Sequence, residues 1–161
     1  MAGRITFSAR LEGGEKVQQR FKTISDALVD CRPLLKRTAS EVIYPEMRSI
    51  FLAGGKPKWT PLAASTLKRK TTKFILIETR KLMRSLISNT SPNSIYRLSS
   101  HRLEIGSKLK TKGDKYYLGS LHQEGTSKMP KREIFSKTTI KKIFDGMLKI
   151  GLQIVQKAER K

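Results

Sequence analysis

Apolar and polar residues alternate at the start of the chain. Single polar residues separate Ile5, Phe7, Ala9 and Leu11. A period of two is typical of a strand that buries one face, and the glycine pair at 13–14 would end such a strand. The pattern therefore predicts a strand near the N-terminus.

The residues that follow change to a helical period, with apolar positions three and four apart. This spacing predicts a helix that ends near Cys31, because Pro33 removes a backbone donor and clashes with the preceding turn. Proline suits the first turn of a helix, so we expect a second helix from Pro33 to Phe51, which Pro45 can bend. Cys31 is interpreted as a small buried apolar residue. The stripe of the first helix consists of Val17, Phe21, Ile24, Leu28, Cys31 and Leu35.

Glycine and proline punctuate the middle of the chain. The stretch 54–58 has the composition of a loop. Thr60 and Pro61 predict the cap and the first turn of a short helix that continues to Lys70. Apolar residues again follow a helical spacing over 78–88. The inward residues of this helix are expected to be Leu82, Met83, Leu86 and Ile87.

Two short apolar segments, 95–98 and 103–105, predict a β-hairpin. The stretch 107–115 contains four lysines and no apolar periodicity, so we expect a flexible basic loop there. A short helix capped by Gly125 and a long C-terminal helix complete the chain. The stripe of the C-terminal helix consists of Ile140, Ile143, Phe144, Met147, Gly151, Ile154 and Ala158.

Strands at the start and in the middle, with helices between them and at the end, predict an α+β fold. We expect one small mixed domain over residues 1–161, with an N-terminal strand, a β-hairpin and several helices including a C-terminal helix. The sequence shows no internal repeat and no interdomain linker.

Charge is the outlying property of the composition. The chain has 34 Lys and Arg against 13 Asp and Glu, a formal net charge of +21. Such a chain attracts polyanions or acidic protein surfaces, and the alternative is a surface that only aids solubility. One cysteine allows no intramolecular disulfide, and no run of residues approaches the roughly 20 apolar residues of a membrane span. We expect a soluble protein made in the cytoplasm.

The sequence offers little catalytic chemistry. Two histidines and one cysteine, without metal-binding spacing, do not predict a zinc site. Cys31 lies on an apolar stripe, and the glycine spacings of phosphate-binding loops are absent. We therefore expect no enzyme, no metal and no cofactor.

Basic residues gather in three clusters that could neutralise phosphates or contact an acidic protein. Lysine predominates, and a lysine is a point charge rather than a fork that reads bases, so we do not expect sequence-specific DNA recognition. Trp59 could stack on single-stranded nucleic acid, but we favour an anchor that ties a loop to the core. His122 is interpreted as a structural histidine. The clusters are Lys56, Lys58, Lys68, Arg69, Lys70 and Lys73; Lys108, Lys110, Lys112 and Lys115; and Lys128, Lys131 and Arg132.

Three groups of residues share their order and spacing with one known family. The first consists of Phe51, Gly54, Gly55, Trp59, Pro61, Leu62, Thr66 and Lys70. The second consists of Ile75, Leu76, Thr79, Leu82 and Ser85. The third consists of His122, Gln123, Gly125, Met129, Pro130, Arg132 and Phe135. With these residues the chain resembles the virion-morphogenesis family of tailed bacteriophages, which includes the tail-completion proteins of Mu-like and P2-like phages.

The resemblance implies a structural virion protein that completes or terminates the tail and helps to join it to the head at the neck. The implied partners are a tail tube or terminator protein, a head connector and further copies of the same chain in a ring, such as a hexamer. It also implies assembly in the host cytoplasm, no membrane, and lysines that could touch the genomic DNA. The alternative from a different class is a basic protein that binds nucleic acid nonspecifically.

The chain departs from the family pattern at several positions. Arg80 stands where the family has glycine, so we expect plain helix at that turn. Glu124 replaces an aromatic residue that follows the His-Gln pair in the family.

Pro130 and Arg132 are expected to fix a loop, with the arginine tying it by charge-assisted hydrogen bonds.

Overall fold

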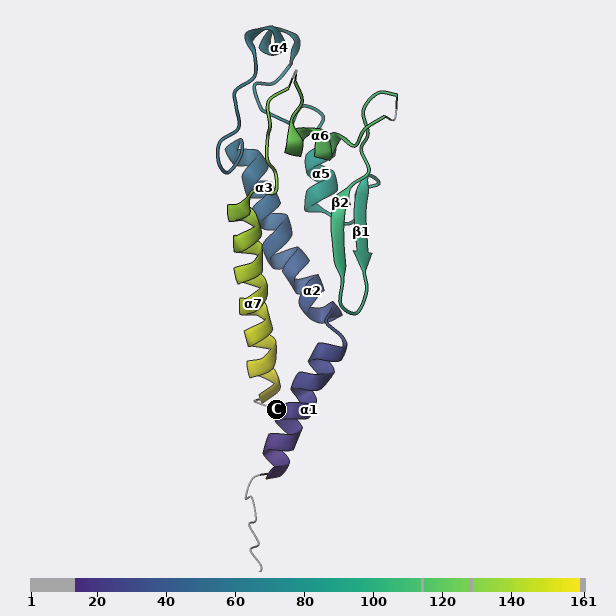
Figure 1. Ribbon diagram of the computed structural model, residues 1–161, viewed down its shortest axis with the longest axis vertical. Coiled ribbons are helices and arrows are strands. Elements are labelled where there is room, and N and C mark those ends of the chain that lie inside the picture. The colour runs from purple at the N-terminus through teal and green to yellow at the C-terminus, as the bar shows by residue number, and fades with distance from the viewer. Residues whose placement is uncertain (1–13, 114, 128, 160–161) are drawn as a thin grey trace, which may run out of the picture.

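The computed structural model describes residues 14–113, 115–127 and 129–159, and this part of the chain consists of helices beside one β-hairpin (Figure 1). The N-terminal elements are α1 (Gly14–Val29), α2 (Arg32–Thr38), the π-helical turn η1 (Ala39–Ile43) and α3 (Tyr44–Ala53). The middle holds α4 (Ala64–Arg69), α5 (Lys81–Ile87), β1 (Ser94–Leu98) and β2 (Leu103–Ser107). The chain ends with α6 (Leu118–Glu124) and α7 (Lys137–Glu159).

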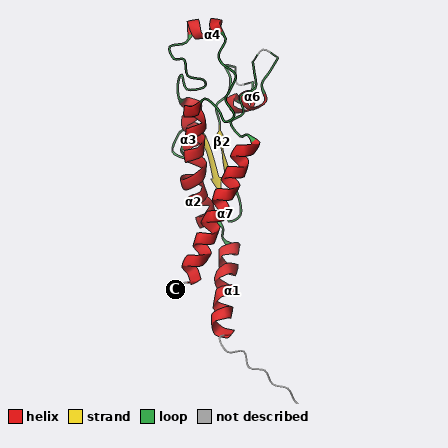
Figure 2. Cartoon of the chain, turned by 90° about the vertical axis from the view of Figure 1, so that its left-hand side faces the viewer, coloured by secondary structure: helices red, strands yellow, loops and turns green. Residues whose placement is uncertain are grey.

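These elements confirm an α+β fold with a β-hairpin and a C-terminal helix. The molecule is elongated, with α1 at one end and α4 at the other (Figures 1 and 2). The strand predicted over residues 5–11 lies outside the described residues.

Helices α2 and α3 are joined by η1 into one helical rod. Pro33 lies in the first turn of α2, as the sequence predicts. Pro45 has no N–H to donate to the preceding turn, yet the rod does not end there. The turn before it is wider instead, because the Tyr44 N–H bonds to the Ala39 carbonyl five residues back. The rod therefore accommodates Pro45 through a π turn.

Helix α7 runs back along this rod, against α2 and η1 (Figure 1). The closest approach is at Gly146, where an added Cβ would lie 2.7 Å from the Cγ1 atom of Val42. An ion pair between Lys142 and the buried Glu46 connects the N-terminal part of α7 to α3. A side chain at position 146 would therefore push α7 away from the rod.

The apolar core lies where α3, α5 and the segments after α3 and α6 meet. Its members come from distant parts of the chain, and each large side chain that leaves water contributes about 1.5–3 kcal/mol. The sequence-predicted inward residues Leu82, Met83 and Leu86 are all buried, while Ile87 is half-buried. The core consists of Met47, Ile50, Phe51, Trp59, Ile77, Leu82, Met83, Leu86 and Ile134.

Strands β1 and β2 form the predicted hairpin and pack against α5. The pairing is antiparallel, with Tyr96 opposite Ile105 and Leu98 opposite Leu103. Cys31, at the junction of α1 and α2, is half-buried, and its N–H donates to the Ser100 carbonyl at 2.7 Å. The hairpin turn is thereby tied to the start of the rod.

Two predicted helix starts are wrong. Helix α4 begins at Ala64 rather than at Pro61, and Ala63, which precedes it, is extended and provides no side-chain cap. Residues 60–63, which follow the buried Trp59, form no regular secondary structure. Helix α5 begins at Lys81 rather than at residue 78, because Arg80 adopts a left-handed conformation with φ +54°. Plain helix at Arg80 is therefore also a wrong prediction.

Both long terminal helices are confirmed, but their apolar stripes are only partly covered. On α1, Phe21 is 68% exposed. On α7, the predicted inward residues Ile140 and Phe144 are 54% and 56% exposed. The face of α7 that meets the rod keeps Ile143 from the predicted stripe and adds Thr139, Gly146 and Ile150.

The left-handed backbone at Arg80 leads to a stability prediction. A side chain in this conformation costs about 1–2 kcal/mol, whereas glycine adopts it readily but loses more chain entropy on folding. We expect Arg80→Gly to raise the free energy of unfolding by about 0.5–1 kcal/mol in urea denaturation. The matched variant Arg84→Gly, inside α5, should lower it by about 1 kcal/mol. Destabilisation of similar size by both variants would contradict the left-handed assignment.

Candidate functional site

The first and third groups of family-like residues meet in the fold. Trp59 donates its indole Nε1–H to the Glu133 carbonyl at 2.8 Å and packs edge-on against Phe51, with ring centroids 5.8 Å apart. The Ser136 hydroxyl donates to the Lys56 carbonyl at 2.8 Å. These contacts join residues 51–59 to residues 122–136. We call residues 122–136 the clasp segment.

Gln123 holds the clasp segment closed with its side-chain amide. Its Oε1 accepts the backbone N–H groups of Ile134 and Phe135, at 2.9 and 3.0 Å. Its Nε2 donates to the Phe135 carbonyl at 3.1 Å. An amide offers both an acceptor and donors, so glutamine fits this position better than an acid or an apolar residue.

Gly125 lets the chain turn back after α6. Its backbone has φ +76° and ψ 179°, a region that is almost restricted to glycine. A Cβ atom here would lie 2.8 Å from the backbone nitrogen of Lys131. The return brings the Arg132 N–H to the His122 carbonyl, at 2.7 Å. The glycine is therefore needed for both its conformation and its lack of a side chain.

The two residues that this backbone hydrogen bond joins, Arg132 and His122, are both basic and both buried. Arg132 is 6% exposed and His122 is 9% exposed. Neither the Arg132 Nε nor the His122 Nδ1 has a hydrogen-bond partner among the described residues. Burial lowers the pKa of His122 from 6.5 to about 4, and the positive charges of Arg132 and Lys70 act in the same direction. His122 is therefore neutral at pH 7.

The fold separates the other predicted site residues. Phe51, Trp59 and Ile134 are core residues, so the prediction that Trp59 anchors a loop is confirmed, and its buried ring is closed to nucleic acid. The expected charge-assisted bonds of Arg132 are not found among the described residues; the Arg132 backbone makes the tie instead. Pro61 and Pro130 are exposed, while Leu62, Thr66, Gln123, Gly125 and Phe135 are half-buried.

The fold divides the predicted basic clusters into residues that are exposed and residues that are buried or paired. Lys56 bonds to the Ser49 hydroxyl at 2.6 Å and Lys70 pairs with Glu78 at 3.3 Å, so neither points freely into solvent. In the third cluster Arg132 is buried, and Lys131 is exposed but pairs with Glu133. The exposed basic residues of the first two clusters are Lys58, Lys68, Arg69, Lys73, Lys108, Lys110, Lys112 and Lys115.

The exposed lysines lie at the end of the molecule opposite α1, around α4 and the loop before α6 (Figures 1 and 2). This loop, predicted to be flexible over 107–115, is closed at its base. The Leu118 N–H donates to the Leu109 carbonyl at 2.8 Å, and Lys110 lies over the Tyr117 ring at 5.7 Å. The loop therefore presents its lysines on a defined base.

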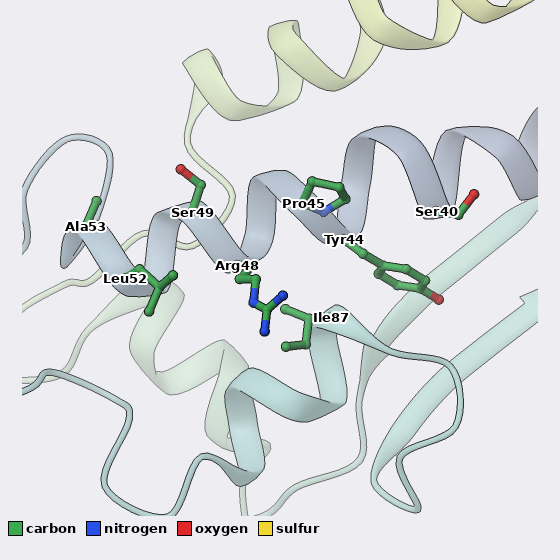
Figure 3. A pocket seen from close by; sticks show the side chains of 8 residues that line it. All are labelled: Ser40, Tyr44, Pro45, Arg48, Ser49, Leu52, Ala53 and Ile87. Carbon is green, nitrogen blue, oxygen red and sulfur yellow. The ribbon is translucent and has the colours of Figure 1, made fainter.

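A groove of about 830 Å³ opens along α3, and the sequence reasoning did not single it out (Figure 3). The Tyr44 hydroxyl is buried there without a hydrogen-bond partner among the described residues, and burial, with the nearby Tyr96, raises the pKa of the Tyr44 phenol. The spacing of four between residues 40, 44, 48 and 52 was the signal that could have found this face. The groove is lined by Ser40, Tyr44, Pro45, Arg48, Ser49, Leu52, Ala53 and Ile87.

Within the described ranges, no three His, Cys, Asp or Glu side chains gather as metal ligands would. No helix of the described chain has the length and apolar character needed to cross a bilayer. No protein-family model, no curated protein and no solved structure matches this chain.

Gly125 gives a prediction with a control nearby in the chain. We expect Gly125→Ala to lower the free energy of unfolding by at least about 2 kcal/mol, because it combines a strained backbone with a clash at Lys131. Gly119→Ala in α6 meets no atom within 4 Å and should be neutral or slightly stabilising. Chemical denaturation of both variants measures the difference, and equal stabilities would contradict the close return of the chain.

His122 gives a prediction about acid stability. Between about pH 6.5 and pH 4 this histidine binds a proton in the unfolded state but not in the folded state, so stability falls as the pH drops. From pH 7 to pH 5 the loss should be about 2 kcal/mol. Denaturation at both pH values should show that His122→Asn removes this dependence, whereas His101→Asn keeps it. An unchanged dependence in His122→Asn would show that another group is responsible.

Proposed function

We propose that this protein is a structural component of a tailed-phage particle that completes the tail and helps to join it to the head. The proposal has two supports. One is the family resemblance of the segments 51–70, 75–85 and 122–135. The other, which carries the proposal, is a set of large apolar side chains that a single copy leaves exposed on α7 and α1. Such surfaces are typical of proteins that work in assemblies.

The exposed residues of α7 form a ridge. They are four residues apart, and their exposed fractions lie between 54% and 64%. A row of this spacing is the kind that packs into the groove of another helix. Each Å² of this apolar surface that a partner covers would contribute roughly 25 cal/mol to the free energy of association. This α7 ridge consists of Ile140, Phe144, Leu148 and Leu152.

A closed ring needs two different surfaces on each subunit, one that fits into the other. The apolar α7 ridge and the Tyr44 groove on α3, which is lined by both apolar and polar side chains, are two different surfaces that could meet in this way (Figure 3). Leu52, on the groove, is itself 64% exposed. We propose a ring of identical subunits, such as a hexamer, within the neck, next to a tail tube or terminator protein and a head connector.

The second candidate is a protein that binds nucleic acid without sequence preference. The observation in its favour is the group of exposed lysines around α4 and the loop before α6. A protein of this kind loses affinity steeply with salt, because each neutralised phosphate releases counterions. DNA binding that depends on Lys108, Lys110 and Lys112 and falls with salt would favour this candidate.

Electron microscopy of lysates from a phage that lacks this gene tests the proposal. Full heads and unjoined tails would support a role in joining. Abnormally long or ragged tails would move the role to tail termination. Normal, infectious particles would contradict the structural role and favour nucleic-acid binding.

The α7 ridge gives a point prediction. We expect Phe144→Ser to reduce ring formation by at least about tenfold, because a serine removes one of the four exposed apolar side chains. The same change at Phe74, which is 62% exposed in the loop before α5, is the matched control and should leave assembly unchanged. Light scattering of the purified variants measures the mass of the assembly, and complementation of the deleted gene measures its use. Equal behaviour of the two variants would exclude the ridge as the interface.

A further inference from the structure

The guanidinium of Arg132 lacks the partner that its surroundings require. The residue is 6% exposed, and its Nε is buried without a hydrogen-bond partner in the described part of the chain. Arginine stays charged in proteins, and a buried donor of a charged group is costly to leave unpaired. In folded proteins such a group is normally matched by an anion.

Two acids that could be considered as partners are already engaged with other cations. Glu133, next in sequence, pairs with Lys131. Glu78 pairs with Lys70 at 3.3 Å. The counter-charge for Arg132 is therefore not provided by these residues.

His122 adds a second unmet polar atom at the same place. Its carbonyl accepts the Arg132 N–H, which fixes the two residues beside each other, and its Nδ1 is buried without a partner among the described residues. Both Arg132 and Lys70 act on the imidazole through their positive charges. A neutral imidazole with its proton on Nδ1 is a hydrogen-bond donor.

We propose that Arg132 and His122 form a binding site for one oxyanion, a carboxylate or a phosphate group, that comes from outside this chain. The Arg132 guanidinium supplies a charged fork that matches two oxygen atoms of such a group. With its proton on Nδ1, His122 supplies a further donor. The small exposed fraction of Arg132 limits the ligand to a single compact group at the end of a molecule or side chain.

The site does not depend on the role in tail completion, so it is tested on the purified full-length protein. The probes are inorganic phosphate and acetate, which represent a phosphate group and a protein carboxylate. Each is added at constant ionic strength against sodium chloride. The readouts are the thermal unfolding temperature and the NMR signals of the His122 ring. We expect a saturable rise in the unfolding temperature and a rise in the pKa of His122, because a bound anion favours the imidazolium form.

Three variants separate the site from general effects of salt. Arg132→Lys keeps the charge but loses the fork, and should weaken the apparent affinity by at least about tenfold. Arg132→Met keeps much of the buried stem and should abolish the saturable effect. Arg84→Met makes the same change on the exposed side of α5 and should leave the affinity unchanged. If Arg132→Met does not fold, the wild-type titration and Arg132→Lys decide the matter.

A response to phosphate alone would assign the site to a phosphate group, and a response to acetate would assign it to a carboxylate; both support the proposal. A linear, unsaturated response that matches sodium chloride would overturn it. Saturable binding of equal strength in Arg132→Lys and Arg132→Met would also overturn it, since the anion would then lie elsewhere.

Discussion

One hydrogen bond joins the two parts of the core that lie farthest apart in the sequence. The Trp59 indole reaches across to the Glu133 carbonyl, and the two partners are 74 positions apart along the chain. The bond is partly buried, and breaking it would leave the indole N–H of the buried Trp59 without its partner. The orientation of Trp59, its contact with Phe51 and the path of the clasp segment all depend on this bond.

The segment that closes the core also presents the unpaired basic groups. Gln123 and Gly125 fix the backbone on either side of the return, which leaves His122 and Arg132 little freedom to move apart. A site built on backbone hydrogen bonds is held in place before any ligand arrives, so binding need not order it. The same residues therefore serve stability and recognition, and a change in one of them affects both.

The sequence predicts well what local chemistry determines and poorly what packing determines. The helices, the hairpin and the anchoring by Trp59 follow from periodicity, turn residues and the scarcity of tryptophan on surfaces. The covered face of α7 could not be predicted, because the helix carries apolar residues on two sides and only the rod selects one. The π turn before Pro45 and the left-handed Arg80 were not predicted, because no apolar period or turn residue marks either of them. The burial of Arg132 was hidden because lysine and arginine runs are usually solvated.

The position of α1 makes stability uneven along the molecule. This helix extends beyond the core, with Phe21 and Val29 largely in water (Figure 1). Local opening costs little where apolar side chains are already exposed to water, as those of Phe21 and Val29 are. Its amide hydrogens should therefore exchange with solvent long before those of α3 and α5. A neighbouring molecule that covered α1 would convert this labile end into a protected one, which makes hydrogen exchange a direct reporter of assembly.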